Sequence, residues 1–265
     1  MATVISGLFQ CSACGEPSPA RGEAAAVVEA EDSRPGAPVP DRAGAMARHD
    51  RALEALGTTR QTLAAHYREA ESEAERARVR ERARKELEAA IIEDVFPAWM
   101  GMPWGMSSTS TATRPHETGK TIGCSYFVTS VLQSAGVELE NRYTFAQAPA
   151  LHIQRSLAPR RDDLHTYFSI PAQRLHDGIA KLGDGLYIIG LDTHVGFVVV
   201  RGDQVRLVHA SYTDARVVTD EPLLTARAIE NSRPQGYFVT PLFRDGRLMD
   251  MWLRGQPVPF QRLGA

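Results

Sequence analysis

The amino-acid sequence predicts an α+β protein in which helices come first and an antiparallel sheet follows. Residues 47–95 are rich in Ala, Arg, Glu and Leu, which favour helices. An apolar stripe with helical spacing begins at Cys124. Residues 185–211 contain β-rich runs separated by turn residues. We therefore expect the helix that starts at Cys124 to pack on an antiparallel sheet.

Length and composition limit the classes of protein to consider. A chain of 265 residues can form one domain of moderate size plus an extension. The net charge of −2 gives no reason to expect nucleic-acid binding, and the sequence lacks the long apolar run that a membrane-spanning helix needs. We expect a flexible linker over 1–45, a charged helical extension over 46–96 and the main domain over 97–265.

The helical extension is expected to contain two helices. Gly57 to Thr59 would separate them, and Pro97 would end the second. The charge-rich surface indicates a solvated helix, with a coiled-coil partner as the alternative. The segment from Trp99 to Gly105 is too apolar for an ordinary loop. It is either a packing plug or one wall of a substrate cleft.

Cys124 is a candidate nucleophile. In the first turn of a helix, unpaired backbone N–H groups and the macrodipole lower the pKa of a thiol. The alternative is that Cys124 only opens the buried stripe, since free cysteines are often buried. The stripe consists of Cys124, Phe127, Val128, Val131, Leu132 and Ala135.

Two histidines follow on predicted strands. His194 opens the second of two β-rich runs that join near Asp192, and His209 lies on the next run. Paired as a hairpin, these strands would bring His209 beside His194. A cysteine at a helix start, a histidine at a strand start and a polar residue one strand later can supply nucleophile, base and orienter. Asp192 is a reserve orienter.

Three motifs in this order resemble the NlpC/P60 cysteine peptidases, which have a papain-like fold. That family has motifs of the form Asp-Cys-Ser-Gly-Phe-Val, His-Val-Gly-Ile-Tyr and Ile-His-Ala-Ser. The matching segments here are Gly123 to Val128, His194 to Val198 and Val208 to Ser211. Tyr126 stands where the family usually has glycine, and Gly123 replaces the acid before the cysteine. These departures indicate a divergent member.

The resemblance implies a hydrolase with a catalytic triad. Cys124 would attack the carbonyl as a thiolate, His194 would act as the base and His209 would orient it. The implied substrate is a peptide of the bacterial cell wall, such as a peptidoglycan stem peptide, and no metal or organic cofactor is needed. The candidate substrate-binding residues are Trp99, Trp104, Ser125, Tyr126, Asp192, Ser211 and Tyr212.

Two other functions stay open at this point. One is an amidase or acyltransferase that acts on a substrate outside the cell wall. The other is an inactive papain-like module that binds wall peptide or a partner through the same cleft. Retention of both Cys124 and His194 favours an enzyme.

The N-terminal cysteines bear on location. Cys11 and Cys14 form a Cys-x-x-Cys, but the further ligands of a zinc site and the context of a redox motif are missing from the sequence. Ser12 to Gly15 is similar to a bacterial lipoprotein junction, so Cys14 is a candidate lipid anchor. The export signal is not intact, since Met1 to Phe9 is short and uncharged. We expect the cell envelope or periplasm, and the cytoplasm stays open.

The C-terminal third is expected to complete the sheet. Ser169 would cap a short helix, and Glu221 to Glu230 would form another. Gln235 to Phe243 and Arg247 to Leu253 are interpreted as two closing strands.

Overall fold

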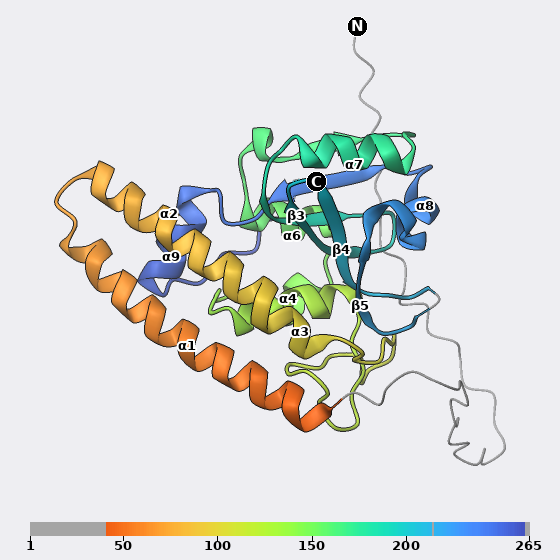
Figure 1. Ribbon diagram of the computed structural model, residues 1–265, viewed down its shortest axis with the longest axis horizontal. Helices are drawn as coiled ribbons and strands as arrows, with labels where there is room; N and C mark the ends of the chain where they lie inside the picture. The colour runs from red at the N-terminus through yellow and green to blue at the C-terminus, as the bar shows by residue number, and fades with distance from the viewer. Residues whose placement is uncertain (1–40, 214, 263–265) are drawn as a thin grey trace, which may run out of the picture.

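The computed structural model describes residues 41–213 and 215–262. One sheet lies at its centre, with helices on both faces, and two long N-terminal helices form a hairpin beside it (Figure 1). The expectations for Cys11, Cys14 and most of the linker fall outside the described residues. The strands are β1 (His165–Tyr167), β2 (Gly185–Gly190), β3 (Val195–Arg201), β4 (Gln204–Ala210), β5 (Val218–Pro222) and β6 (Tyr237–Pro241).

The six strands run in the order β1-β6-β2-β3-β4-β5, and every neighbouring pair is antiparallel. The predicted α+β class is therefore confirmed. The α-helices are α1 (Arg42–Glu69), α2 (Glu73–Ala90), α3 (Phe96–Trp99), α4 (Cys124–Ser134), α5 (Arg142–Ala146), α6 (Ala150–Leu157), α7 (Ala172–Ala180), α8 (Arg227–Ser232) and α9 (Gly246–Arg254). Shorter helical turns are η1 (Ile91–Val95), η2 (Arg161–Asp163) and η3 (Leu223–Thr225).

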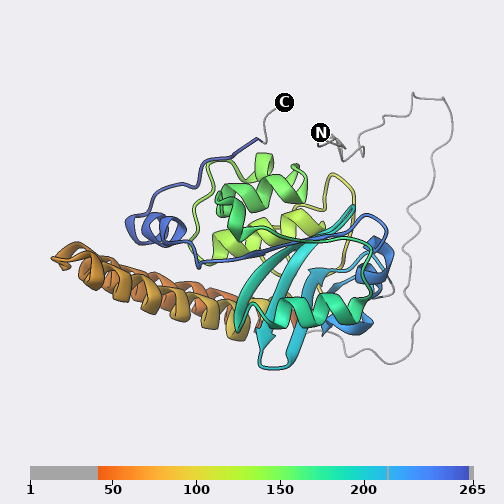
Figure 2. The same ribbon diagram turned by 90° about the horizontal axis from the view of Figure 1, so that it is seen from above.

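The central strands β2, β3 and β4 are buried on both faces of the sheet. Successive side chains of a strand point to opposite sides, so each central strand contributes to two cores. Phe197 and Val208 join the core on the face that α4 covers, whereas Val198 and Leu207 join the core beneath α7 and α8. Figure 2 shows the sheet between α4 to α6 on one side and α7 on the other. The helix that begins at Cys124 thus packs on the antiparallel sheet, as predicted.

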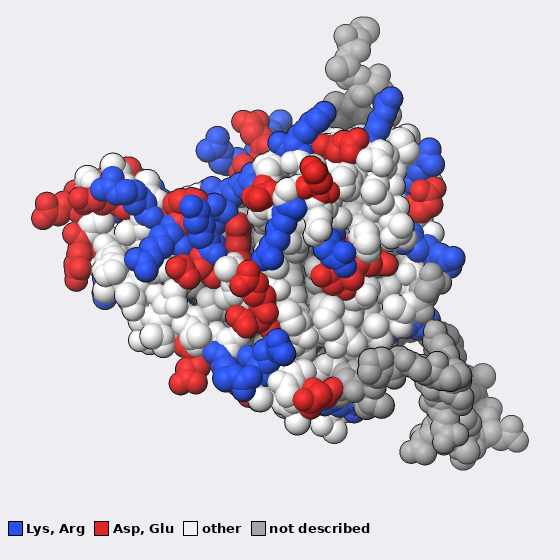
Figure 3. Space-filling view, viewed as in Figure 1, with Lys and Arg blue, Asp and Glu red and all other residues white. Residues whose placement is uncertain are grey.

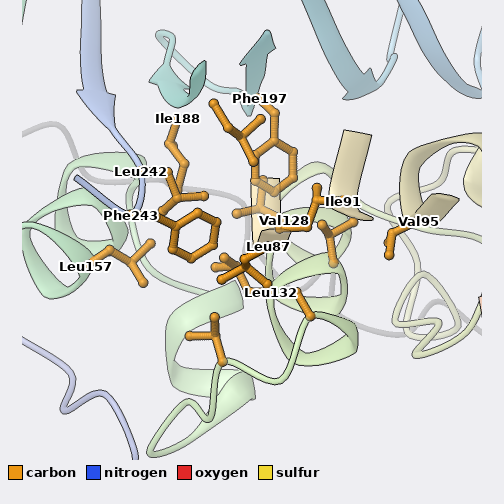
Figure 4. Close-up of a cluster of buried hydrophobic side chains, with 14 of the residues drawn as sticks. Leu87, Ile91, Val95, Val128, Leu132, Leu157, Ile188, Phe197, Leu242 and Phe243 are labelled. Carbon is orange, nitrogen blue, oxygen red and sulfur yellow. The ribbon is translucent and has the colours of Figure 1, made fainter. Parts of the chain in front are cut away.

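The first core also includes the helical hairpin, which we define as α1 and α2. Leu87 on α2 and Ile91 on η1 are fully buried and point toward Val128 on α4 and Phe197 on β3 (Figure 4). The ring of Phe197 lies 5.8 Å from that of Phe127 on α4. The hairpin therefore shares one hydrophobic core with the sheet.

The outer surface of the hairpin carries interleaved charges (Figure 3). On α2, the exposed side chains of Lys85 and Glu81 pair at 3.6 Å, and those of Arg82 and Glu86 pair at 4.0 Å. Pairs at this spacing stabilise a helix by about 0.2–0.5 kcal/mol each. This pattern fits the solvated helix of the sequence analysis.

The predicted helix boundaries in the hairpin are wrong. α1 runs without a break through Gly57, and the chain turns only at Ala70 to Ser72. Ser72 accepts from the backbone N–H of Glu75, whose carboxylate accepts from the N–H of Ser72. This capping box is a stronger helix start than Thr59 offers. α1 also begins at Arg42, inside the predicted linker.

Pro97 does not end the second helix. The turn η1 is a π-helix, and its hydrogen-bond pattern joins the N–H of Phe96 to the carbonyl of Ile91. The chain then continues as α3 to Trp99, with Pro97 in the first turn. Proline is tolerated at the start of a helix because the N–H it lacks is not needed there.

Three further predictions near the C-terminus are wrong. Residues 247–253 lie in α9, capped by Asp245, rather than in a strand. Glu221 lies in β5, and the helix predicted around it begins only at Arg227. α7 starts after Pro171, so Ser169 is not its cap. A short apolar run does not by itself distinguish a strand from a helix.

The continuity of α1 predicts that Gly57→Ala stabilises the protein. The added Cβ would meet nothing within 4 Å, and alanine in a helix is favoured over glycine by about 0.5–1 kcal/mol. Urea unfolding should show this increase. Gly202→Ala is the matched control, since that site is equally open but has φ +56, where alanine costs roughly 1–2 kcal/mol. A destabilised Gly57→Ala would contradict the continuous helix.

Candidate active site

His194 and His209 form a hydrogen-bonded pair at one end of the sheet. His194 immediately precedes β3 and His209 lies on β4. The two strands pair as a hairpin with Phe197 opposite Val208. His194 Nε2 lies 2.7 Å from His209 Nδ1. The predicted meeting of the two histidines is therefore confirmed.

The hydrogen-bond chain continues to Glu221 on β5. Glu221 Oε1 lies 2.8 Å from His209 Nε2. In the β4–β5 pairing, Leu207 is opposite Glu221 and His209 is opposite Thr219, so Glu221 reaches His209 diagonally. His209 is fully buried, and the Glu221 side chain is 29% exposed.

Sequence reasoning missed Glu221 because it assigned this residue to a helix. The available signal was the β-branched run Val217, Val218 and Thr219, which leads directly toward Glu221. A strand continuing this run antiparallel to β4 places Glu221 near His209.

Gly196 makes room for the histidine pair. A Cβ built on Gly196 would lie 2.9 Å from the Cβ of His209 and 3.2 Å from the carbonyl oxygen of Val208. The glycine of the His-Val-Gly motif thus lets His209 lie against the backbone of β3.

Cys124 is the first residue of α4, and Gly123 in extended conformation precedes it. The cysteine is half-buried, and its Sγ lies 3.8 Å from Ser125 Oγ. The predicted position in a first helical turn is confirmed. Backbone N–H groups at this position favour negative charge on the sulfur.

A chain of contacts connects the start of α4 with His194. The N–H of Gly105 donates to the carbonyl of Ile122, two residues before Cys124. The ring of the adjacent Trp104 lies 6.5 Å from that of Tyr212, and the Tyr212 ring lies 5.1 Å from that of His194. Trp104 and Tyr212 are both half-buried, and their role in substrate binding stays a prediction.

Arg216 fixes the position of Trp104. Its guanidinium lies 4.7 Å from the centre of the Trp104 ring, and its carbonyl accepts from the Trp104 N–H at 2.8 Å. Arg216 has φ 49, a conformation that non-glycine residues rarely adopt. Such strain is typical of sites where the surrounding contacts determine the backbone.

Three other predicted substrate-binding residues lie near these motifs. Ser125 and Tyr126 are half-buried in the first turn of α4, and Arg142 lies 5.2 Å over the Tyr126 ring. Ser211 is buried, and its Oγ lies 2.9 Å from Thr213 Oγ1. Ser211 therefore holds the loop after β4.

Trp99 and Asp192 do not join the site. Trp99 is fully buried and packs edge-on against Phe127, so it is the packing plug and not a cleft wall. Asp192 is exposed in the turn before His194. His194 bonds to His209 instead, which corrects the reserve role given to Asp192.

Burial controls the charge of His194, which is only 4% exposed. Loss of hydration, and then the charge of nearby His209, lower the pKa of His194 well below its ordinary value. His194 is therefore neutral at pH 7 and able to accept a proton.

Metal chemistry and membrane insertion gain no support from the described residues. Over 41–213 and 215–262, no cluster of three or more His, Cys, Asp or Glu side chains is arranged to hold a metal ion. In the same part of the chain, no helix is both long and apolar enough to span a bilayer. Two surface hollows lie elsewhere, one beside Arg80 and Met249 and the other beside His49 and Ser134.

The lowered pKa of His194 predicts acid-sensitive stability. Below pH 6.5, the usual histidine value, the unfolded chain binds a proton more readily than the folded one. The stability that comes from keeping His194 neutral is fully present above pH 6.5. As the pH falls toward the pKa of the folded state, the free energy of unfolding decreases by at most about 1.4 kcal/mol per pH unit.

Urea unfolding of His194→Gln between pH 7.5 and 4.5 measures this contribution. The slope of unfolding free energy against pH should be shallower than in the wild type. The control is His66→Gln, at an exposed position on α1, which should keep the wild-type slope. Equal slopes in all three proteins would show that His194 is not held neutral by burial.

Comparisons with protein-family models, with curated proteins and with solved structures found no match for this chain. The motifs and the geometry of four residues therefore indicate the function: His194, His209, Glu221 and Cys124.

Proposed function

We propose that the protein is a divergent NlpC/P60-like cysteine hydrolase with a papain-like core, which cleaves amide or peptide bonds. The observation that carries this proposal is the 2.7 Å hydrogen bond between His194 and His209. These two residues come from separate sequence motifs of the proposed family. They meet at the end of the sheet, and contacts run from His194 through Tyr212 and Trp104 to Gly105, whose N–H bonds to Ile122 two residues before Cys124.

The proposed reaction uses the ring nitrogen of His194 that does not bond to His209. His194 uses Nε2 to bond to His209, so Nδ1 is its base. As Cys124 Sγ attacks the carbonyl, Nδ1 takes the thiol proton, and it then gives that proton to the leaving amine. The new S–C bond forms a thioester as the C–N bond breaks. A water molecule, deprotonated by the same nitrogen, then hydrolyses the thioester and regenerates the thiol.

The low proton affinity of His194 defines its role. A histidine with a pKa well below 6.5 is neutral at rest, so the thiol transfers its proton during attack. This is general-base catalysis, which typically contributes 10²–10⁴-fold to a rate.

The start of α4 can stabilise the intermediate. The backbone N–H of Cys124 is among the first N–H groups of the helix, which the helix itself does not use. Directed at the developing oxyanion, such a donor is typically worth 10²-fold or more in turnover. Trp104, Tyr126 and Tyr212 would line the substrate path.

The proposed substrate is a peptide of the bacterial cell wall, which places the protein in the cell envelope. This assignment rests on the resemblance of the three motifs. Tyr126 stands where that family has a glycine two residues after the nucleophile. This larger side chain supports an amidase or acyltransferase on a different substrate as the alternative.

One observation supports the binding-module alternative. His194 is 4% exposed, and the ring of Tyr212 lies against it. The leaving amine of a substrate can reach this buried histidine only when the ring of Tyr212 moves aside. A module that binds peptide without turnover would keep this ring in place.

The hydrolase predicts fast alkylation of Cys124 by iodoacetamide at neutral pH. A thiol with the free pKa of about 8.5 reacts slowly at pH 7, whereas His194 as a base should accelerate it. His194→Ala should lower the rate at pH 7 by roughly 10²-fold. Peptide mass spectrometry assigns the label to Cys124 rather than to Cys11 or Cys14.

His66→Ala, at an exposed position on α1, is the control and should react like the wild type. Stem-peptide hydrolysis, followed by mass spectrometry and abolished in Cys124→Ser, would then identify the substrate class. A Cys124 that reacts like a free thiol and is indifferent to His194→Ala would refute the hydrolase and leave the binding module.

A further inference from the structure

The hydrogen-bond chain from Glu221 through His209 to His194 determines where the protons lie. A carboxylate accepts hydrogen bonds and donates none. Nε2 of His209, 2.8 Å from Glu221 Oε1, must therefore carry a hydrogen. At a pH where His209 is neutral, its imidazole has one N–H, so Nδ1 of His209 is an acceptor.

The same rule then applies to His194. Its Nε2 faces the acceptor Nδ1 of His209 at 2.7 Å and so carries the hydrogen. Burial holds His194 neutral by lowering its pKa. Nδ1 of His194 is consequently left with a lone pair, the form that a base requires.

We propose that Glu221 is a positioning residue that sets the tautomers of both histidines and so keeps Nδ1 of His194 ready to accept a proton. The inference rests on the proposed hydrolase function. Without Glu221, His209 can carry its hydrogen on Nδ1 and donate it to Nε2 of His194. That arrangement moves the hydrogen of His194 to Nδ1 and blocks it as a base.

The surroundings of Glu221 fit this role. His209 is completely buried, so water does not compete for its Nε2, whereas the 29% exposed Glu221 keeps partial hydration of its charge. When His194 takes the thiol proton, the carboxylate of Glu221 stabilises the positive charge on the two hydrogen-bonded histidines. Its neighbour Asp220 instead pairs with Arg206 at 2.7 Å.

The test uses four substitutions in the full chain. Glu221→Leu removes the acceptor, and Glu221→Thr does so with a side chain too short to reach His209 but well suited to a strand. Glu221→Gln keeps an acceptor oxygen at the same length. Asp220→Asn is the matched control, since it removes a charge next to Glu221 without touching the histidines.

The first readout is the tautomer of each histidine, from imidazole ¹⁵N NMR shifts in protein labelled at histidine. The wild type, Glu221→Gln and Asp220→Asn should show hydrogen on Nε2 of both rings. Glu221→Leu and Glu221→Thr should move hydrogen to Nδ1. If both folded variants keep the wild-type tautomers, the assignment to Glu221 is overturned, whatever the activity.

The second readout is the alkylation rate of Cys124 at pH 7. A wrong tautomer next to a nucleophile can cost a protease about 10⁴-fold, so we expect a loss of at least 10-fold in Glu221→Leu and Glu221→Thr, with most of the rate kept in Glu221→Gln. Tautomers that shift while Cys124 stays indifferent to His194→Ala would support the role of Glu221 and refute the hydrolase. The two proposals can therefore fail separately.

Discussion

The packing of α4 on β3 is the contact on which the rest of the structure depends. Phe127 and Phe197 are fully buried, and their rings meet edge to face at 5.8 Å. Phe96 and Trp99 from α3, which follows the helical hairpin, pack on the same rings. This one cluster joins the hairpin to the sheet, and it fixes the end of α4 that carries Cys124.

Local patterns predicted the part of the site that is local in sequence. β2, β3 and β4 follow one another with short turns. The positions of His194 and His209 in the sequence therefore predicted that the two side chains meet. Glu221 could not be found in this way because its position depends on β5 pairing with β4. Likewise, the packing of Leu56 and Leu63 on α1 outweighs the roughly 1 kcal/mol that glycine costs a helix at Gly57. The apolar residues of α9 are compatible with either a strand or a helix. The helix forms because Asp245 caps its first turn and its apolar face packs in the core.

Burial gives the site its chemical character. A solvated histidine is partly charged near pH 6.5, but His194 is taken out of water and placed against another imidazole. The resulting neutral ring is useful only if its hydrogen sits on the correct nitrogen. In the proposal for Glu221, its carboxylate fixes the position of that hydrogen from the neighbouring strand β5. The ring of Tyr212 packs against the ring of His194.

The central claim is that Cys124 and His194 act together as nucleophile and base, and acyl-enzyme formation tests it most directly. The full chain is mixed with p-nitrophenyl acetate, and the acylated residue is located by peptide mass spectrometry after acid quench. We predict a burst of nitrophenol with the acetyl group on Cys124, lost in His194→Ala and kept in His66→Ala. A slow reaction without a burst, equal in the wild type and His194→Ala, would contradict the account.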